Sequence, residues 1–296
     1  MASSSNPSLR DVALLTRAVE NVFRKLIRIL IGRMSLKKLQ EMIQIIFVEE
    51  AEAKLVQEAP GKNVSLTKLG SLTDLDTRTL TKIRSSYDSS KPIHLDTSFL
   101  KGFTPGFKVL DLWLNEERYL DKKTKRPKPL SFTGKGITFE KLVDEAVSAR
   151  GVTAKSMLER LLENDFVKVN SGTAQIELVR EDYIFLSNEE LDMIDIGFSA
   201  IASLATTVSH NIENAGSETA RFYQRGCWTY RLNKRNQEEF RRSMLDFLHE
   251  VDRKSKNAIF PFEDSKELPD QLTAGISMFY FEEDAQNRGL WVDKAD

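Results

Sequence analysis

The stretch LTKLGSLTDLDTRTLTKIRS, residues 66–85, decides how the first part of this chain folds. Its leucines recur at the spacing of a short helix, and Gly70 is the small residue that lets a second helix approach closely. Asp74 stands where the chain must bend with φ near or above zero, which aspartate tolerates. Asp76 then caps the second helix with its carboxylate, on the amide of Arg78 or Thr79. The pattern predicts a helix-turn-helix.

The second helix of this pair leaves a polar outer face. Leu80 and Ile83 hold the helix down, and the side chains that remain are donors of the kind that meets phosphates and base edges in a major groove. The candidate DNA-binding residues here are Lys68, Thr77, Arg78, Thr81, Lys82, Arg84 and Ser85. The alternative is an ordinary helical hairpin whose polar face is solvated.

Charge is distributed unevenly along the chain, although the net charge is only −1. Residues 1–135 carry 24 basic and 15 acidic side chains, whereas residues 136–296 carry 19 basic and 29 acidic ones. A positive segment that contains the helix-turn-helix is drawn to a polyanion, and the acidic remainder suits folding, dimerisation or effector contact. The alternative is that the two halves attract each other.

Composition indicates a soluble globular protein. With 296 residues, 41% of them hydrophobic and 29% charged, the chain has the length for two or three domains. Cys227 is the single cysteine, which excludes an internal disulfide and favours a reducing, cytoplasmic setting. The most apolar run, residues 22–31, is interrupted by three basic residues and is shorter than the roughly 20 residues that span a bilayer. We therefore expect no membrane segment.

Two long helices precede the motif and complete a first domain, residues 1–97. Periodicity predicts one helix over residues 9–31, lying over the DNA-binding core, and a second over residues 36–58, capped by Ser35. Both are longer than a minimal DNA-binding core requires, so they also offer a dimer surface. The predicted inward residues are Leu15, Val19, Val22, Leu26 and Ile29 in the first helix, and Leu39, Met42, Ile43, Ile46 and Phe47 in the second.

A helix and a basic segment come next, in residues 98–135. The helix is predicted over residues 105–120, and residues 122–129 then hold five positive charges and two prolines, which keep the segment extended and exposed. This segment is either a linker or a basic arm for phosphate contact. As an arm, it adds Lys122, Lys123, Lys125 and Arg126 to the candidate DNA-binding residues.

The remainder divides into a winged-helix-like domain, residues 136–186, and an α+β domain, residues 187–296. In the former, two helical patterns precede a hairpin turning at Asn170-Ser171-Gly172, and acidic residues where DNA would lie favour a structural or protein-contact role. In the latter we predict a helix over residues 188–214, a strand over 221–232, a helix over 237–254 and a strand over 274–281. Its small residues and strand edges favour dimerisation.

Signs of catalysis or cofactor binding are scarce. His94, His210 and His249 are isolated, and the chain has neither a metal-ligand spacing nor a phosphate-loop motif. Cys227, beside Trp228, is more typical of a buried small residue than of a nucleophile. The acids at 282–284 are expected to be solvated. We therefore expect no enzyme, no cofactor and no metal.

Five segments of the chain are similar to segments of a protein family. They are LIRILIGRMSLKKLQEMIQIIFVEEA, SLTKLGSLTDLDTRTLTKIR, VLDLWLNEERYLDKKTKRPKPL, SMLERLLENDFVKV and ISMFYFEED. Together they resemble an uncharacterised, mainly proteobacterial domain-of-unknown-function family with an N-terminal helix-turn-helix. The resemblance implies a bacterial cytoplasmic origin and this domain order, and it implies no activity or site residue.

The sequence therefore predicts a mainly α fold with an α+β C-terminal part: a helix-turn-helix domain, a winged-helix-like unit and a helix-strand-helix-strand domain. The predicted function is a homodimeric, DNA-binding transcriptional regulator whose partner is double-stranded DNA. The competing prediction is a protein-interaction adaptor that does not bind DNA. An enzyme acting on nucleic acid through late acids such as Glu282 and Glu283 is the third.

Overall fold

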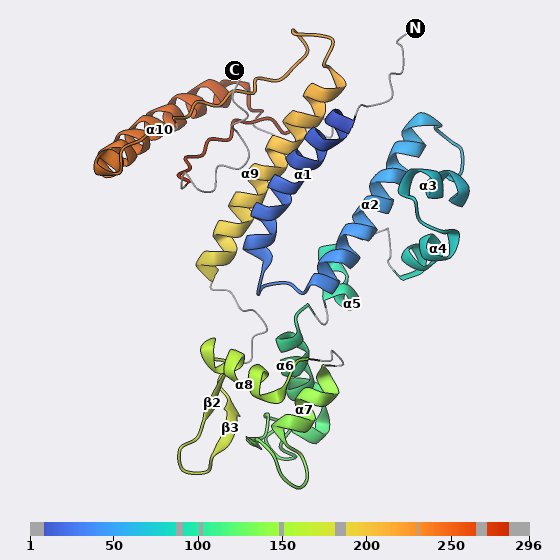
Figure 1. Ribbon diagram of the computed structural model, residues 1–296, viewed down its shortest axis with the longest axis vertical. Coiled ribbons are helices and arrows are strands. Elements are labelled where there is room, and N and C mark those ends of the chain that lie inside the picture. Colours follow the sequence, from blue (N-terminus) through green and yellow to red (C-terminus); the bar gives the residue numbers. More distant parts are fainter. Residues whose placement is uncertain are drawn as a thin grey trace. The chain divides into compact units, whose positions relative to one another are not determined.

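The structure is a computed structural model that describes residues 9–86, 91–100, 103–147, 151–180, 188–229, 231–264 and 271–283. It is mainly helical, with one small sheet (Figure 1). The helices are α1 (Leu9–Leu30), α2 (Leu36–Glu58), α3 (Leu66–Thr73), α4 (Thr77–Ser86), α5 (Thr97–Leu100), α6 (Pro105–Asn115), α7 (Phe139–Ala146), α8 (Ala154–Glu163), α9 (Asn188–Glu213) and α10 (Gln237–Ile259). The strands are β1 (Leu130–Ser131), β2 (Val167–Val169) and β3 (Gln175–Leu178). The predicted mainly α class with some β structure is confirmed.

The chain forms two compact units. Val22–Leu186 is the central unit, and Met1–Asn21 joins Ser187–Asp296 in the terminal unit. The prediction that the first helix lies over the DNA-binding core is wrong for its N-terminal half, because that half belongs to the terminal unit. Periodicity identifies an amphipathic helix but carries no information on the partner that its apolar side will meet.

In the central unit, α2 provides the surface on which α3 and α4 pack. Val48, Ala51, Leu69 and Leu80 form the buried cluster between these helices. The predicted inward stripe of α2 is partly wrong, because Ile43, Ile46 and Phe47 are exposed. α2 is apolar on more than one side, so spacing alone does not select the stripe that becomes the core.

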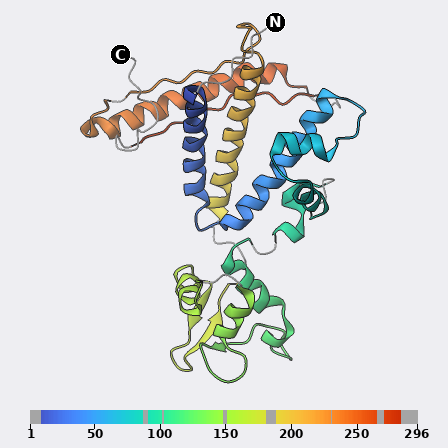
Figure 2. The same cartoon turned by 45° about the vertical axis from the view of Figure 1, so that its right-hand side comes forward.

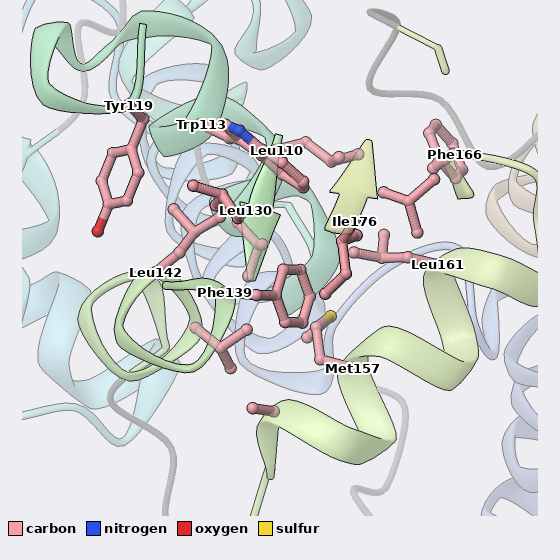
Figure 3. Packing of buried hydrophobic residues seen from close by; sticks show 14 residues of the cluster. Leu110, Trp113, Tyr119, Leu130, Phe139, Leu142, Met157, Leu161, Phe166 and Ile176 are labelled. Carbon is pink, nitrogen blue, oxygen red and sulfur yellow. The ribbon is translucent and has the colours of Figure 1, made fainter. Parts of the chain in front are cut away.

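A second core joins α6, β1, α7, α8, β2 and β3 (Figure 3). Trp113 of α6 and Phe139 of α7 lie at its centre, both fully buried, with ring centroids 5.9 Å apart in an edge-to-face arrangement. The strands form an antiparallel sheet in the order β1-β3-β2. The predicted hairpin is confirmed, with Val167 opposite Leu178 and the turn between β2 and β3.

This second core corrects the predicted division at residue 136. The helix α6 and strand β1 precede that boundary, yet Val109, Trp113 and Leu130 are buried in the same cluster as Phe139 and Ile176. Order along the chain is therefore helix, strand, helix, helix and hairpin, which is a complete winged-helix topology beginning at α6. The sequence prediction missed it because β1, with only two residues, has no visible alternation.

The terminal unit contains α9, α10 and the N-terminal part of α1. The first half of α1 and α9 lie side by side and antiparallel (Figures 1 and 2). The two strands predicted at 221–232 and 274–281 are not formed: the described residues there have no strand pairing, and Tyr230 lies outside the described residues. The predicted inward residues Leu15, Val19 and Val22 of α1 are exposed, which is a second correction.

One helix in the described part of the chain passes a length and composition test for crossing a membrane. It spans Glu189–Glu213 in α9, with a mean hydropathy of 1.4 over its most apolar window, none of which is buried. This helix differs from the apolar run at residues 22–31 that the sequence pattern emphasises.

Candidate nucleic-acid interface

The turn between α3 and α4 has the predicted geometry. Asp74 adopts the left-handed conformation, with φ 55° and ψ 26°, and its amide donates to the carbonyl of Gly70. A Cβ atom at Gly70 would lie 3.1 Å from the carbonyl oxygen of Leu75, closer than most Cβ contacts. The roles predicted for Gly70 and Asp74 are therefore confirmed: one permits the close approach and the other allows the bend.

The start of α4 is fixed by a carboxylate cap. Asp76 Oδ1 accepts a hydrogen bond of 2.8 Å from the amide of Thr79, and Asp76 Oδ2 accepts one of 2.8 Å from the Thr79 hydroxyl. These bonds to the ionised form lower the pKa of Asp76 below its ordinary value. The cap predicted from sequence is confirmed, with Thr79 as the donor.

This cap makes the stability of α4 depend on pH. Because the pKa of Asp76 is lower in the folded chain, its stabilising effect is complete above the ordinary carboxyl pKa and is lost as the pH falls through the folded value. We expect Asp76→Ala to melt at a lower temperature than the parent at pH 7, with the difference shrinking toward pH 2. Asp74→Gly is the control, because glycine accepts the positive φ. A gap that stays constant from pH 7 to pH 2 would contradict the assignment.

The inner face of α4 anchors the helix and the outer face is open. Leu80 is fully buried against α2 and α3, whereas the polar residues predicted to meet DNA are all exposed. Thr81 Oγ1 donates to the carbonyl of Thr77 at 2.7 Å, and Ser85 Oγ donates to that of Lys82 at 3.0 Å. Both hydroxyls therefore stay free to accept hydrogen bonds, and Arg78 and Lys82 supply the positive charge of this face. Residues 77–85 contain no acid.

Two of the predicted DNA-binding residues, Lys68 and Arg84, lie beside this face and differ in their contacts. Lys68 is exposed on α3. Arg84 is not a free cation, because its guanidinium forms an ion pair of 2.5 Å with Glu52 of α2. The pair joins residues 32 positions apart, which short-range sequence spacing does not reveal. Arg84 therefore holds the C-terminal end of α4 onto α2, a role that its prediction as a DNA-binding residue did not include.

The basic segment is a folded loop and not an extended linker. Leu120 bridges Pro127, the amide of Asp121 donates to the carbonyl of Arg126 at 2.8 Å, and Lys125 takes the left-handed conformation. Asp121 Oδ1 accepts hydrogen bonds from the amides of Thr124 and Lys123, and these bonds lower the pKa of Asp121. Lys122, Lys123, Lys125 and Arg126 are all exposed on this loop.

The loop is also attached to the second core. Trp113 Nε1 donates to the carbonyl of Lys128 at 3.1 Å, and the Lys128 amide donates to the carbonyl of Tyr119 at 2.8 Å. Burial and a hydrogen bond to Glu145 raise the pKa of Tyr119 to about 12, so its hydroxyl stays protonated. The candidate DNA-binding residues thus form two groups, one on the α3–α4 pair and one on this loop.

The second helix of the winged-helix topology, α8, carries two exposed acids and has no net charge. On α8, Glu159 and Glu163 are exposed, and Arg160 donates to the carbonyl of Gly32 at 2.7 Å. In helix-turn-helix proteins the second helix of the pair enters the groove, where a polyanion would repel these acids. The structural or protein-contact role of this unit stays a prediction.

His210, Cys227 and Glu282, which the sequence raises as candidates for catalysis or metal binding, belong to the terminal unit. His210 stacks on Phe222, with ring centroids 3.7 Å apart. Glu282 binds Arg241, Tyr280 and Gln237, and these hydrogen bonds lower its pKa to about 2. Asp284 lies outside the described residues. Among the described residues, no group of three or more His, Cys, Asp or Glu side chains is arranged to hold a metal ion. Cys227 is exposed, contrary to the expectation of a buried residue.

Comparison with known proteins identifies a family whose function is not known. The model of a family described as Family of unknown function (DUF6502) matches residues 12–283. A search of curated proteins gave no match.

Proposed function

We propose that this chain, which belongs to the DUF6502 family, is a DNA-binding transcriptional regulator that acts as a homodimer. The observation that carries the proposal is the outer face of α4, which combines Arg78 and Lys82 with three hydroxyls and no acid, all exposed. This helix is the second of a tight pair, the position from which a recognition helix enters the major groove. Arg78 and Lys82 would contact bases or phosphates, and Thr77, Thr81 and Ser85 would accept or donate shorter hydrogen bonds.

The charge of the central unit supports the same proposal. Residues 22–186 hold 28 basic and 22 acidic side chains, whereas the terminal unit holds 15 basic and 22 acidic ones. A polyanion is therefore attracted to the unit that contains α4. Lys68 and the exposed cations of the 120–127 loop would add phosphate contacts. The proposal also includes that the protein is bacterial and cytoplasmic and that its N-terminal part contains a helix-turn-helix.

Salt dependence tests the proposal directly. We expect the purified chain to bind duplex genomic fragments, with an affinity that falls about tenfold or more between about 50 and about 200 mM salt, because bound phosphates release counterions. Fluorescence anisotropy at several salt concentrations measures the slope. A chain that binds no genomic fragment at the lowest salt would refute the proposal.

The second candidate function is a protein-interaction adaptor, and one observation favours it. The exposed acids Glu159 and Glu163 of α8 suit a protein partner better than a nucleic acid. Under this alternative both helix pairs bind proteins, and the affinity for DNA is absent at every salt concentration. A nuclease acting through late acids is less well supported, because Glu282 is held by Arg241. Magnesium-dependent cleavage of the bound duplex would reveal such an activity.

A further inference from the structure

The terminal unit lacks a hydrophobic core in its described residues. Within 9–21, 188–229, 231–264 and 271–283 no residue with a described side chain is buried. Five large apolar side chains before residue 22 and eighteen after residue 187 are 36–94% exposed. Helices in proteins owe most of their stability to tertiary packing of their apolar face. The unit therefore requires a partner that supplies the missing half of its core.

Part of the apolar surface of α9 is not covered by the neighbouring helix. Leu191, Ile194 and Phe198 are half-buried, whereas Met193 and Ile196 are 73% and 71% exposed. Within the terminal unit, the N-terminal half of α1 lies beside α9 (Figure 2), and residues 220–224 contact α9 near its C-terminal end. A Cβ atom at Gly197 would meet nothing within 4 Å, so contacts with the described residues do not account for this small residue.

The helix α1 shows the same feature. Val12, Leu15 and Val19 recur at helical spacing, and they are 48%, 67% and 47% exposed. A stripe of this spacing normally faces a core. In the described structure it faces solvent, so the α1 stripe and the outer side of α9 are both unoccupied by the chain itself.

An ordered but unpaired segment points to the kind of partner. In residues 272–281 the side chains of Leu272, Ile276 and Phe279 are exposed, and the backbone forms no hydrogen bond with other described residues. The segment is nonetheless fixed at its end. Phe240 of α10 contacts the ring of Tyr280, and Glu282 binds Arg241 at 2.9 Å. An extended row of amides and carbonyls that bind no described residue is a template on which another strand can pair.

A second copy of the chain meets these requirements better than a membrane does. Lipid offers no hydrogen bonds to free backbone groups, and Asp192 and Asp195 are exposed within the apolar part of α9. The terminal unit has a net charge of −7, so an anionic membrane surface also repels it. A two-fold axis supplies the same helices and places residues 272–281 beside their own copy in antiparallel orientation.

The available area is sufficient for a stable dimer. An aromatic side chain alone buries about 150–250 Å², and a standard interface covers about 800 Å² on each partner. Fourteen of the twenty-three exposed apolar side chains lie on the surfaces concerned, five on α1, five on α9 and four in residues 272–281, and at roughly 60 Å² each they provide about the area of one such face. Large apolar interfaces of this kind are typical of obligate homodimers.

We propose that a second copy of this chain covers the apolar faces of α1 and α9. The two helix pairs then form a four-helix bundle, and residues 272–281 pair with their two-fold copy. This deepens the homodimer part of the proposed function by naming the surface that dimerises.

The test is the mass of the full chain and of two matched variants at micromolar concentration. Light scattering should give about twice 33.8 kDa for the parent. Met193→Glu/Ile196→Glu should shift the dimer dissociation constant upward by at least about tenfold, because charge enters the buried face. Ala202→Glu should leave it unchanged, since Ala202 lies on the polar line of Asp195, Ser199 and Thr206. Circular dichroism verifies that helix content is retained.

Further measurements keep the outcome decisive if the double variant does not fold. In the parent, amides of residues 272–281 should exchange with deuterium at least about tenfold more slowly than unstructured amides. A parent that is monomeric at micromolar concentration, or that sediments with lipid vesicles of neutral or anionic composition, would overturn the inference. A parent that dimerises yet exchanges these amides freely would overturn the strand pairing. A dimer that binds no DNA would refute the proposed DNA binding and leave this inference standing. A monomer that binds DNA would refute this inference and the homodimer part of the proposed function, and leave the DNA binding standing.

Discussion

Replacing Arg78 and Lys82 together with alanine is expected to weaken specific DNA binding by about 30-fold or more, since each base contact contributes roughly 1–3 kcal/mol. If both side chains contact phosphate instead, the loss should be smaller and equal for all sequences. Both side chains are exposed, so the melting temperature should stay close to that of the parent. Titrations with a selected duplex and a random duplex distinguish the two kinds of contact.

Two variants serve as controls for this result. Lys108→Ala/Lys155→Ala removes the same charge from exposed positions on α6 and α8, and should change binding much less. Leu80→Ala should lower the stability of the α3–α4 pair by about 2–5 kcal/mol and lose DNA binding only as the fold is lost. If Arg78→Ala/Lys82→Ala binds every duplex as tightly as the parent, the outer face of α4 is a solvated surface and not a recognition surface.

The largest effect on stability is expected from Phe139→Ala. Phe139 is fully buried, it contacts the ring of Trp113 edge to face, and it stacks on Phe132 with ring centroids 6.2 Å apart. Truncation leaves a cavity between α6 and α7 and should lower the free energy of unfolding of the second core by about 3–5 kcal/mol. Urea unfolding measures the change, followed by tryptophan fluorescence in a chain whose Trp228 and Trp291 are replaced by phenylalanine.

Ile137→Ala is the control for this variant, because Ile137 is exposed only two residues away. Its loss should change the free energy of unfolding by less than about 1 kcal/mol. A Phe139→Ala chain that unfolds at the parent's urea concentration would show that α6 and α7 do not share one core, and the domain division at residue 136 would be restored.

Local features of the helix pair could be predicted from the sequence because short-range chemistry fixes them. Gly70, Asp74 and Asp76 act on neighbours within six residues, and the structure has each of them in its predicted role. The hairpin between β2 and β3 was predictable for the same reason. Turn chemistry and alternation are both local signals.

Features that depend on distant partners could not be predicted in this way. The ion pair of Arg84 with Glu52 joins two helices, and the choice between the apolar stripes of α2 depends on where α3 and α4 settle. The segment at 274–281 has the alternation of a strand, yet strand pairing requires a second strand that the described chain does not supply. Pattern identifies which residues prefer burial, and tertiary structure decides which of them obtain it.

The 120–127 loop has a thermodynamic consequence for whatever anion it meets. A flexible lysine-rich tail must lose backbone freedom when it binds, at roughly 1–2 kcal/mol per residue fixed. Here the bridge from Leu120 to Pro127 and the carboxylate of Asp121 have already fixed the backbone during folding. The four cations therefore form an array with preset spacing, and ligands whose phosphates match that spacing are favoured over ligands of equal charge that do not.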